Sequence, residues 1–138
     1  MKVVFILYNI YEVKSGVSNK YLKFFDFLSL NNIEFLVITS LNNLNSIKHI
    51  NNIVNVKGIN IPLYNQIKIP NINFDDLKVF INHNDIIIFN GEFYWLYNLL
   101  KNIKKTYNNI KLIPNWHTNY DYYSEIYFKN NLILKKVK

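Results

Sequence analysis

The fold is most clearly indicated by one stretch of the sequence, Asp85-Ile86-Ile87-Ile88-Phe89. An unbroken apolar run of this length is typical of a parallel strand that is covered on both faces. Gly91 follows shortly, and apolar residues then recur at helical spacing, at Leu96, Leu99, Leu100 and Ile103. The stretch therefore predicts a strand, a tight turn and a helix whose apolar stripe packs on a core.

The N-terminal residues repeat this order. Residues 3–8 form a second apolar run, and a polar turn over residues 9–16 leads into a helix. The apolar residues of this helix have the spacing of a buried stripe: Val17, Tyr21, Phe24, Phe25 and Leu28. Asparagines at positions 31–32 end the helix, and residues 33–39 predict another strand.

The middle of the sequence is less regular. Residues 41–52 are rich in asparagine and predict a loop or a weak helix, whereas residues 53–56 predict a third strand. Residues 58–70 contain two prolines and are expected to form an ordered but irregular connection. Asn73 can then cap a short helix, because Asp75 and Asp76 fall in a first turn where the helix dipole favours negative charge. The buried stripe of this helix is expected to be Phe74, Leu77 and Ile81.

A last strand is expected at residues 110–113, and a tyrosine-rich helix at residues 121–128. Strands and helices therefore alternate with short connections. This order predicts a single α/β domain over residues 1–138, with an open, mostly parallel, Rossmann-like sheet and helices on both faces. Ligands of such sheets bind outside the carboxyl ends of the strands. The turns expected at that edge are residues 9–18, 90–93 and 115–120.

Composition limits the classes of function. The chain has no cysteine, which excludes a disulfide framework, a thiolate metal site and a cysteine nucleophile. The formal net charge is +7, but every basic residue is lysine, and arginine is the residue best suited to contacting phosphates and guanine edges. Nucleic acid is therefore not expected as a partner. The absence of arginine and alanine, with abundant asparagine, isoleucine, lysine and tyrosine, is the composition expected from an AT-rich genome.

No segment approaches the roughly 18 to 20 uninterrupted apolar residues of a membrane span. A signal peptide is not expected either, because the first apolar run is short and no small-residue cleavage site follows it. A helix that carries Trp95, Lys101, Lys104 and Lys105 is either a solvated helix end or a basic surface that touches a membrane. The expected location is cytoplasmic, with peripheral membrane contact as the alternative.

Three places could carry chemistry. Gly16, Val17 and Ser18 lie at the head of the first helix, where free amides and the dipole favour an anion such as phosphate, although a simple turn is the alternative. His117 follows the last strand and could act as a general base or hold a sugar hydroxyl or phosphate, or else be hydrogen-bonded for structural reasons. Glu92 is the acidic residue best placed to face a cleft. The histidines lack a metal-binding spacing, so a zinc site is not expected.

A cluster of tyrosines directly follows His117, and it consists of Tyr120, Tyr122, Tyr123 and Tyr127. Aromatic faces stack on sugars, so the cluster could line an acceptor site. Tyr123 and Tyr127 also have the spacing of a buried helical stripe, and this interpretation is favoured for those two residues.

Taken in order, these turns resemble the N-terminal domain of family-four retaining glycosyltransferases of the GT-B fold, in particular the glycolipid glucosyl-, mannosyl- and sulfoquinovosyltransferases. That family begins with a strand, a Gly-Gly-Val-type turn and a long helix, and this chain has Ser15-Gly16-Val17-Ser18 at that place. A Pro-Leu-Tyr loop of the family is matched by residues 61–68, and an Asp-led strand by residues 85–89. The last block of the family is a His-Thr-Asp/Asn-Phe segment followed by tyrosine, for which the chain has His117-Thr118-Asn119-Tyr120.

The resemblance covers residues 1–128 and implies transfer of a sugar from a nucleotide-sugar donor to a glycan or lipid acceptor. It places Gly16, Val17 and Ser18 against the donor diphosphate and His117 in the cleft as the catalytic residue. Acceptor-binding residues are expected to be Glu92, Asn119 and Tyr120. The nucleotide sugar is then a substrate, and neither a metal nor another cofactor is expected.

In that family a second Rossmann-like domain makes most contacts to the donor nucleotide, and it would begin beyond residue 138. The chain alone is therefore expected to be inactive, whether it is an excised domain, a remnant or a split gene product that needs a donor-domain partner chain. Two other hypotheses stay open. The chain could be a non-catalytic subunit that binds a glycan or a partner, or a flavodoxin-like or nucleic-acid-binding domain.

Overall fold

The computed structural model describes residues 1–41, 44, 46–61, 64–90 and 95–115. Its helices are α1 (Gly16–Leu30), α2 (Phe74–Leu77) and α3 (Trp95–Thr106), and a 3-10 helix, η1 (Lys78–Phe80), directly follows α2. Its strands are β1 (Val3–Ile6), β2 (Phe35–Leu41), β3 (Lys48–Ile50), β4 (Ile53–Ile61), β5 (Tyr64–Pro70), β6 (Ile86–Asn90) and β7 (Lys111–Asn115).

The described strands form one mixed, mostly parallel sheet. Their order is β3-β4-β2-β1-β6-β7, and β5 pairs with β4 off this path. The pairs β4–β2, β2–β1, β1–β6 and β6–β7 are parallel, whereas β3 and β5 are antiparallel to β4. The predicted fold class, an open Rossmann-like α/β sheet, is confirmed.

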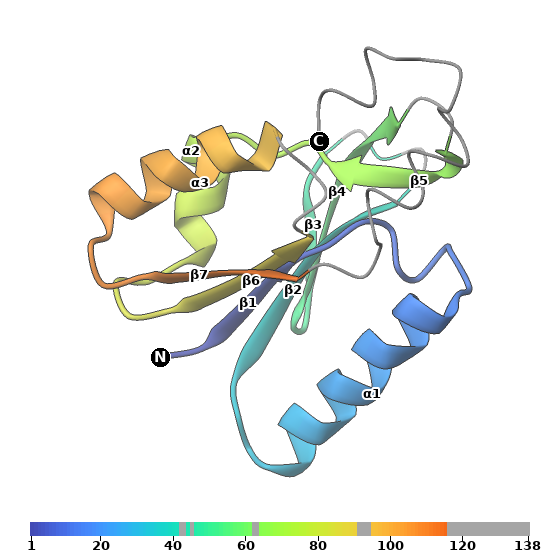
Figure 1. Cartoon of the computed structure of the whole chain (residues 1–138), viewed down its shortest axis with the longest axis horizontal. Helices are drawn as coiled ribbons and strands as arrows, with labels where there is room; N and C mark the ends of the chain where they lie inside the picture. Colours follow the sequence, from blue (N-terminus) through green and yellow to red (C-terminus); the bar gives the residue numbers. More distant parts are fainter. Residues whose placement is uncertain (42–43, 45, 62–63, 91–94, 116–138) are drawn as a thin grey trace, which may run out of the picture.

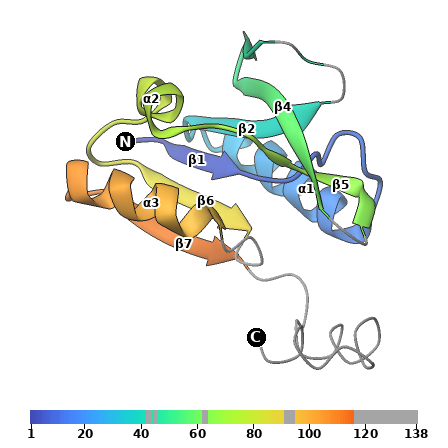
Figure 2. The ribbon, with the colours of Figure 1, turned by 90° about the horizontal axis from the view of Figure 1, so that it is seen from above.

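Helices cover both faces of this sheet. Figure 1 shows α1 on one face and α2 with α3 on the other, and Figure 2 shows the same layers from above. The arrangement follows from the hand of the connections. Helix α1 joins β1 to β2 and α3 joins β6 to β7, which are steps in opposite directions along the sheet, so right-handed crossovers place the two helices on opposite faces.

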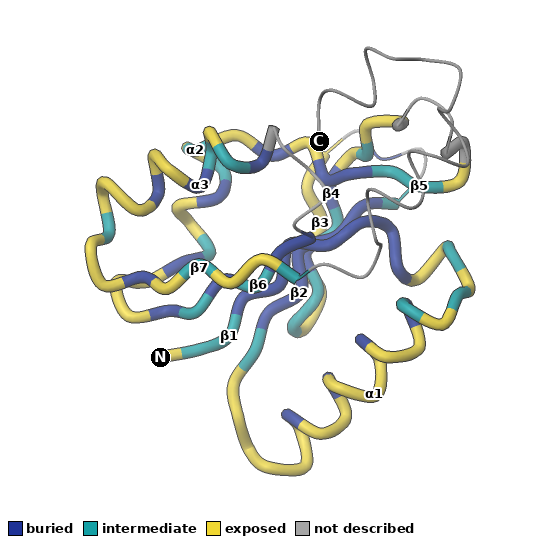
Figure 3. The backbone as a smooth tube through the Cα atoms, viewed as in Figure 1, coloured by how far each residue is buried: buried dark blue, intermediate teal, exposed yellow. Residues whose placement is uncertain are grey.

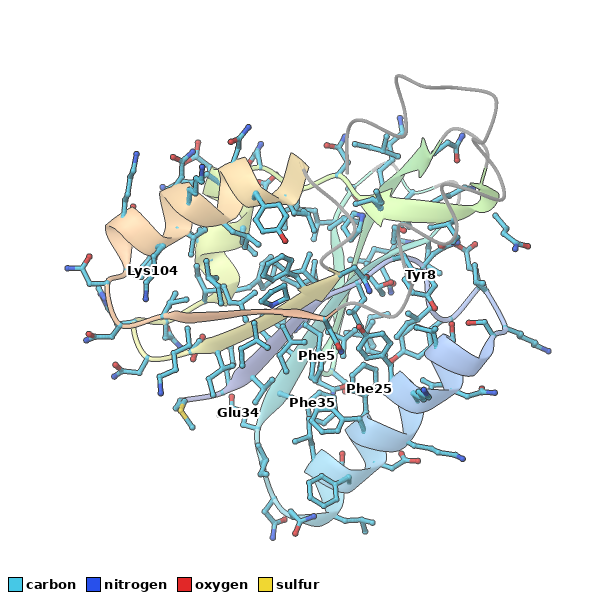
Figure 4. All side chains as sticks on the ribbon, in the orientation of Figure 1. Phe5, Tyr8, Phe25, Glu34, Phe35 and Lys104 are labelled. Carbon is cyan, nitrogen blue, oxygen red and sulfur yellow. The ribbon has the colours of Figure 1, made fainter. Side chains whose placement is uncertain are left out.

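The core lies along the central strands, as the buried positions in Figure 3 show. Phe5 of β1 is fully buried and meets α1 edge-to-face, with its ring centroid 4.8 Å from that of Phe25. Phe25 in turn stacks on Phe35 of β2 at 5.3 Å, and Figure 4 labels all three rings. This aromatic cluster fixes α1 over β1 and β2, because edge-to-face and stacked pairs add to the burial of apolar area.

Helix α1 begins and ends where the sequence predicts. Ser15 is the N-cap, and Asn31 follows the last turn as the C-cap. Within the predicted stripe, Tyr21, Phe25 and Leu28 are buried and Val17 is half-buried, but Phe24 is 40% exposed. The prediction for Phe24 is therefore only partly right, because this ring lies at the rim of the helix–sheet contact, edge-to-face with Phe5 at 5.8 Å.

The predicted weak helix or loop at residues 41–52 is wrong in one part. Residues Lys48–Ile50 form β3, which pairs antiparallel with the start of β4. The connecting residues include Asn51 at a φ of 54°, and asparagine tolerates this left-handed conformation better than most residues. The asparagines that suggested a loop therefore make the turn of a hairpin.

The predicted irregular connection at residues 58–70 is also wrong. The second half of β4 pairs antiparallel with β5, from Gly58 opposite Pro70 onward, with an irregularity near Ile61. Among the described strands β5 pairs only with β4, so Pro70 at its end leaves no ladder on the other side without an N–H donor. The hairpin extends past the carboxyl ends of β1 and β2, where β5 lies in Figure 2.

The other predicted elements are confirmed within the described residues. The Asn73 side chain accepts a hydrogen bond from the Asp76 N–H at 2.8 Å and caps α2 as expected. In the predicted α3 stripe, Leu96, Leu100 and Ile103 are buried and Leu99 is half-buried. In the stripe predicted after Asn73, Leu77 and Ile81 are buried and Phe74 is half-buried. The helix predicted at residues 121–128 lies outside the described residues. None of the helices in the described ranges is long and apolar enough to cross a membrane.

Candidate binding site at the carboxyl edge of the sheet

The carboxyl ends of β1, β6 and β7 lie side by side. Ile6, Phe89 and Pro114 occupy one register position across these three strands. The residues that follow each strand therefore gather at a single edge, as expected for a parallel sheet. The beginnings of the three predicted turns are confirmed as neighbours: residues from Asn9 onward, Asn90 and Asn115.

Tyr8 is the centre of this edge. Its N–H donates to Asn90 Oδ1 at 3.0 Å, and its carbonyl accepts from Thr39 Oγ1 at 2.6 Å. Its hydroxyl shares a hydrogen bond of 2.8 Å with Ser18 Oγ on α1. Figure 4 shows Tyr8 between the sheet and the N-terminal end of α1. One buried tyrosine thus holds three segments, the ends of β2 and β6 and the start of α1, at fixed positions.

Tyr21 makes a second bridge from α1 to the same edge. Its hydroxyl oxygen accepts from Asn90 Nδ2 at 3.3 Å and from Asn115 Nδ2 at 3.3 Å. Asn90 is buried, so its amide contacts both tyrosines inside the protein. The two tyrosines and the two asparagines form a connected polar network that orients the starts of the turns after β6 and β7.

The N-terminal turn of α1 is open on its outer side. The Ser15 side chain accepts from the Ser18 N–H at 3.1 Å, and the first intrahelical bond runs from the Asn19 N–H to the Ser15 carbonyl at 3.0 Å. The amides of Gly16 and Val17 precede that bond, so they have no acceptor within the helix. Gly16 is exposed, and a Cβ built there would meet nothing within 4 Å. The turn can therefore be approached closely from solvent.

The β4–β5 hairpin forms a wall beside this turn. The Asn9 N–H donates to the Lys68 carbonyl at 3.1 Å, and the Lys68 N–H donates to Asn9 Oδ1 at 2.9 Å. Asn9 Nδ2 also donates to the Gln66 carbonyl at 2.9 Å and to Glu12 Oε1 at 3.2 Å. Asn9 thus binds β5 much as a neighbouring strand would, which fixes the first turn against the hairpin.

The hydrogen-bonded network at the described part of this edge is neutral, whereas Glu12 and Lys14 of the first turn and Lys68 of β5 are charged. Amides and hydroxyls dominate the network, and such groups donate to and accept from hydroxyls and phosphate oxygens. Partial burial raises the pKa of the Tyr11 hydroxyl above its ordinary value of 10.0. Within the described ranges, no group of three or more histidine, aspartate or glutamate side chains gathers as a metal site.

The predicted site residues are placed unequally. Gly16 and Val17 lie at the open turn, but Ser18 is buried, with its hydroxyl on Tyr8 and its N–H on Ser15. The other predicted site residues lie outside the described part of the chain: Glu92, His117, Asn119 and Tyr120. Their roles stay predictions.

Sequence reasoning missed the residues that organise the edge. Tyr8 ends an apolar run and Tyr21 belongs to a helical stripe, so both were interpretable as core, and both are indeed buried. The signal that could have found them is their polar atom, because a buried tyrosine hydroxyl needs a hydrogen-bond partner. Asn9 could have been found by its position, because it is the first polar residue after the first strand and therefore lies at the carboxyl edge.

Comparisons with known proteins add no relative. A scan against protein-family models, a search of curated proteins and a search of solved structures each returned no match for this chain.

Proposed function

We propose that this chain is the acceptor-side, Rossmann-like domain of a family-four, GT-B-type glycosyltransferase, which moves a sugar from a nucleotide-sugar donor to a glycan or lipid acceptor. The observation that carries the proposal is the open N-terminal turn of α1 at the carboxyl edge. Its two amides without intrahelical acceptors lie at the positive end of a 15-residue helix. This is an arrangement that suits the diphosphate of a nucleotide sugar.

Gly16 supports this assignment because neither packing nor backbone conformation accounts for a glycine there. A Cβ would meet nothing within 4 Å, and no described glycine has a positive φ. A glycine at position 16 is explained if a ligand approaches the backbone closely there, because glycine has no side chain to keep the ligand away. The neighbouring network of tyrosines and asparagines is largely buried, so it supports the site by fixing the starts of the turns after β6 and β7.

In this proposal the donor diphosphate lies against Gly16 and Val17, while Ser18 acts by holding Tyr8. His117, Glu92, Asn119 and Tyr120 keep the catalytic and acceptor roles that the family resemblance implies. Most contacts to the nucleotide come from a second domain, so the chain alone binds a nucleoside diphosphate weakly and transfers no sugar.

The proposal is tested by titrating the ¹⁵N-labelled full chain with uridine diphosphate and recording amide chemical shifts. The Gly16 and Val17 amides are expected to move most. Gly16→Ala is expected to weaken binding about tenfold, or about 1.4 kcal/mol, because the methyl group keeps the phosphate from the backbone. Asn19→Ala, an exposed residue in the same helix, is the matched control and is expected to bind as the unchanged chain does.

Two outcomes contradict the proposal. One is that the amide resonances of Gly16 and Val17 do not shift at millimolar uridine diphosphate. The other is a glycan that binds the same edge while uridine diphosphate and guanosine diphosphate both fail to bind, which would favour the non-catalytic glycan-binding subunit. Gly16→Ala should not destabilise the fold, because alanine is at least as good as glycine within a helix. A loss of binding in this variant would therefore not be a loss of structure.

A further inference from the structure

One part of the sheet surface is apolar and uncovered in the described part of the chain. On the α1 face, Val37, Phe5, Ile88 and Ile113 form one row across β2, β1, β6 and β7. Val37 and Phe5 are fully buried, Ile88 is half-buried and Ile113 is 45% exposed. Exposure rises along the row because α1 lies over β1 and β2 but not over β6 and β7.

Helix α1 adds an aromatic wall to this surface. Phe24 is 40% exposed and Phe27 is 55% exposed, and their rings stack at 6.2 Å. A hollow of about 290 Å³ lies between α1 and the strands β6 and β7, and we call it the β7 hollow. Its lining residues are Phe5, Lys20, Tyr21, Phe24, Ile88, Ile113 and Asn115. Contiguous apolar surface is where protein segments, partners or ligands bind, so this hollow is a candidate docking surface.

We propose that residues 121–137 of the same chain pack into the β7 hollow, through an apolar stripe that includes Tyr123 and Tyr127, with residues 116–120 as the connection at the carboxyl edge. Asn115, the residue directly before this connection, itself lines the hollow and donates to the Tyr21 hydroxyl on α1. The segment is therefore joined covalently to a residue that lines the hollow, at the carboxyl end of β7. This inference is independent of the proposed sugar transfer.

The length of the segment fits the space. A helix over residues 121–137 would be about 25 Å long at 1.5 Å per residue. By the same rise α1 is about 22 Å long, and β7 is about 16 Å long at the rise of a strand. The segment can thus run back along β7 beside α1, from the carboxyl edge of the sheet to its amino edge.

The side chains of the segment fit the surface as well. Tyr123 and Tyr127 recur at helical spacing, and Ile126, Ile133 and Val137 extend the same apolar face. The acidic residues of the segment, Asp121 and Glu125, fall near its start, where Lys20 of α1 lines the hollow. The apolar face and the two acidic residues therefore match the hollow, while the four lysines at positions 129, 135, 136 and 138 lie beyond the acidic residues. The match at the start of the segment favours it over a second copy of the chain or a lipid surface.

The test uses cysteine cross-linking in the full chain, which contains no native cysteine. The hollow pair is Lys20→Cys with Ser124→Cys, and the control pair is Asn98→Cys with Ser124→Cys. Asn98 is exposed on α3, on the opposite face of the sheet. With a short bifunctional maleimide, the hollow pair is expected to close within the monomer at least about tenfold faster than the control pair.

Three outcomes overturn the proposal: equal rates for the two pairs, cross-links that form only between two chains, and cross-links that form only when anionic lipid vesicles are added. The second outcome would identify a second copy as the occupant, and the third would identify a membrane. Near-ultraviolet circular dichroism checks that each variant is folded.

Hydrogen exchange gives a measurement without a cross-linker. In Ile113→Lys, the amides of residues 121–128 are expected to exchange about tenfold faster, because a lysine in the hollow opposes burial of the stripe and favours local opening. Val79→Lys is the matched control, since Val79 is 74% exposed in η1, away from the hollow. Unchanged exchange in Ile113→Lys, or equal acceleration in the control, contradicts the proposal.

Discussion

At the scale of single residues, buried polar side chains hold the two ends of the central strands. Asn90 does this at the carboxyl edge, where it contacts Tyr8 and Tyr21. Asp85 does it at the amino edge, where it is fully buried and accepts from the Lys2 N–H at 3.1 Å, from Lys2 Nζ at 2.7 Å and from the Asn82 N–H at 2.7 Å. Each side chain ties β6 to the strand or turn beside it.

Replacing Asp85 is therefore expected to destabilise the protein strongly. Asp85→Ala leaves three donors without their acceptor, among them the ammonium group of Lys2, whose side chain is only 12% exposed. The expected loss is about 3 kcal/mol in the free energy of unfolding, as for other buried ion pairs that lose one partner. Urea denaturation followed by circular dichroism measures it.

The control for this change is Asp26→Ala, which removes an exposed aspartate from α1 and is expected to change stability by less than about 0.5 kcal/mol. If both variants lost the same stability, the Asp85 network would have no special role.

At the scale of elements, the β4–β5 hairpin depends on a glycine. A Cβ at Gly58 would lie 2.7 Å from Lys68 Cβ and 3.0 Å from Ser40 Oγ. Both contacts involve atoms at or near the backbone of neighbouring strands, so neither can move away easily. The hairpin, which carries the wall of the candidate site, can approach β2 this closely because residue 58 lacks a side chain.

Gly58→Ala is accordingly expected to cost about 1–3 kcal/mol, the usual range for overpacking a tight contact. Thermal unfolding of the full chain measures the loss, and Gly16→Ala provides the same chemical change at a position with open space. Equal melting temperatures for the two variants would show that the contact at Gly58 is relieved without cost.

At the scale of the whole molecule, one core joins both helical layers through the central strands. Val4, Phe5 and Ile6 of β1 are all fully buried, and they face α1 on one side of the sheet and the layer of α2 and α3 on the other. A core shared in this way predicts cooperative unfolding, because no layer can be removed without exposing β1.

Ile38→Ala tests this property. Ile38 is fully buried in β2, and its truncation is expected to lower the free energy of unfolding by about 2–5 kcal/mol. Far-ultraviolet and near-ultraviolet circular dichroism should follow one common transition in the variant. Ile50→Ala makes the same change at a 63% exposed position of β3 and should lose far less stability. Separate transitions for the two probes would indicate layers that unfold independently.

The sequence by itself determined the elements whose cause is local. The apolar runs of β1 and β6, the stripes of α1 and α3 and the caps at Asn31 and Asn73 each depend on residues within one or two turns of each other. The alternation of these elements was enough to predict the Rossmann-like class, because right-handed connections leave few other arrangements. The same local reasoning placed Gly16 and Val17 at a helix N-terminus on the carboxyl edge.

Only the tertiary structure decided what depends on distant residues. The pairing of β3 and β5 with β4 overrode a composition that suggested loops, because strand pairing gains its stability from the neighbouring strand rather than from local propensity. The exposure of Phe24 depends on where the helix meets the sheet. Tyr8 and Asn90 lie 82 residues apart in sequence, yet they share a buried hydrogen bond. A buried polar group without a hydrogen-bond partner is costly, and its partner can come from any strand that ends at the same edge. Such a partner cannot be read from neighbouring residues in the sequence.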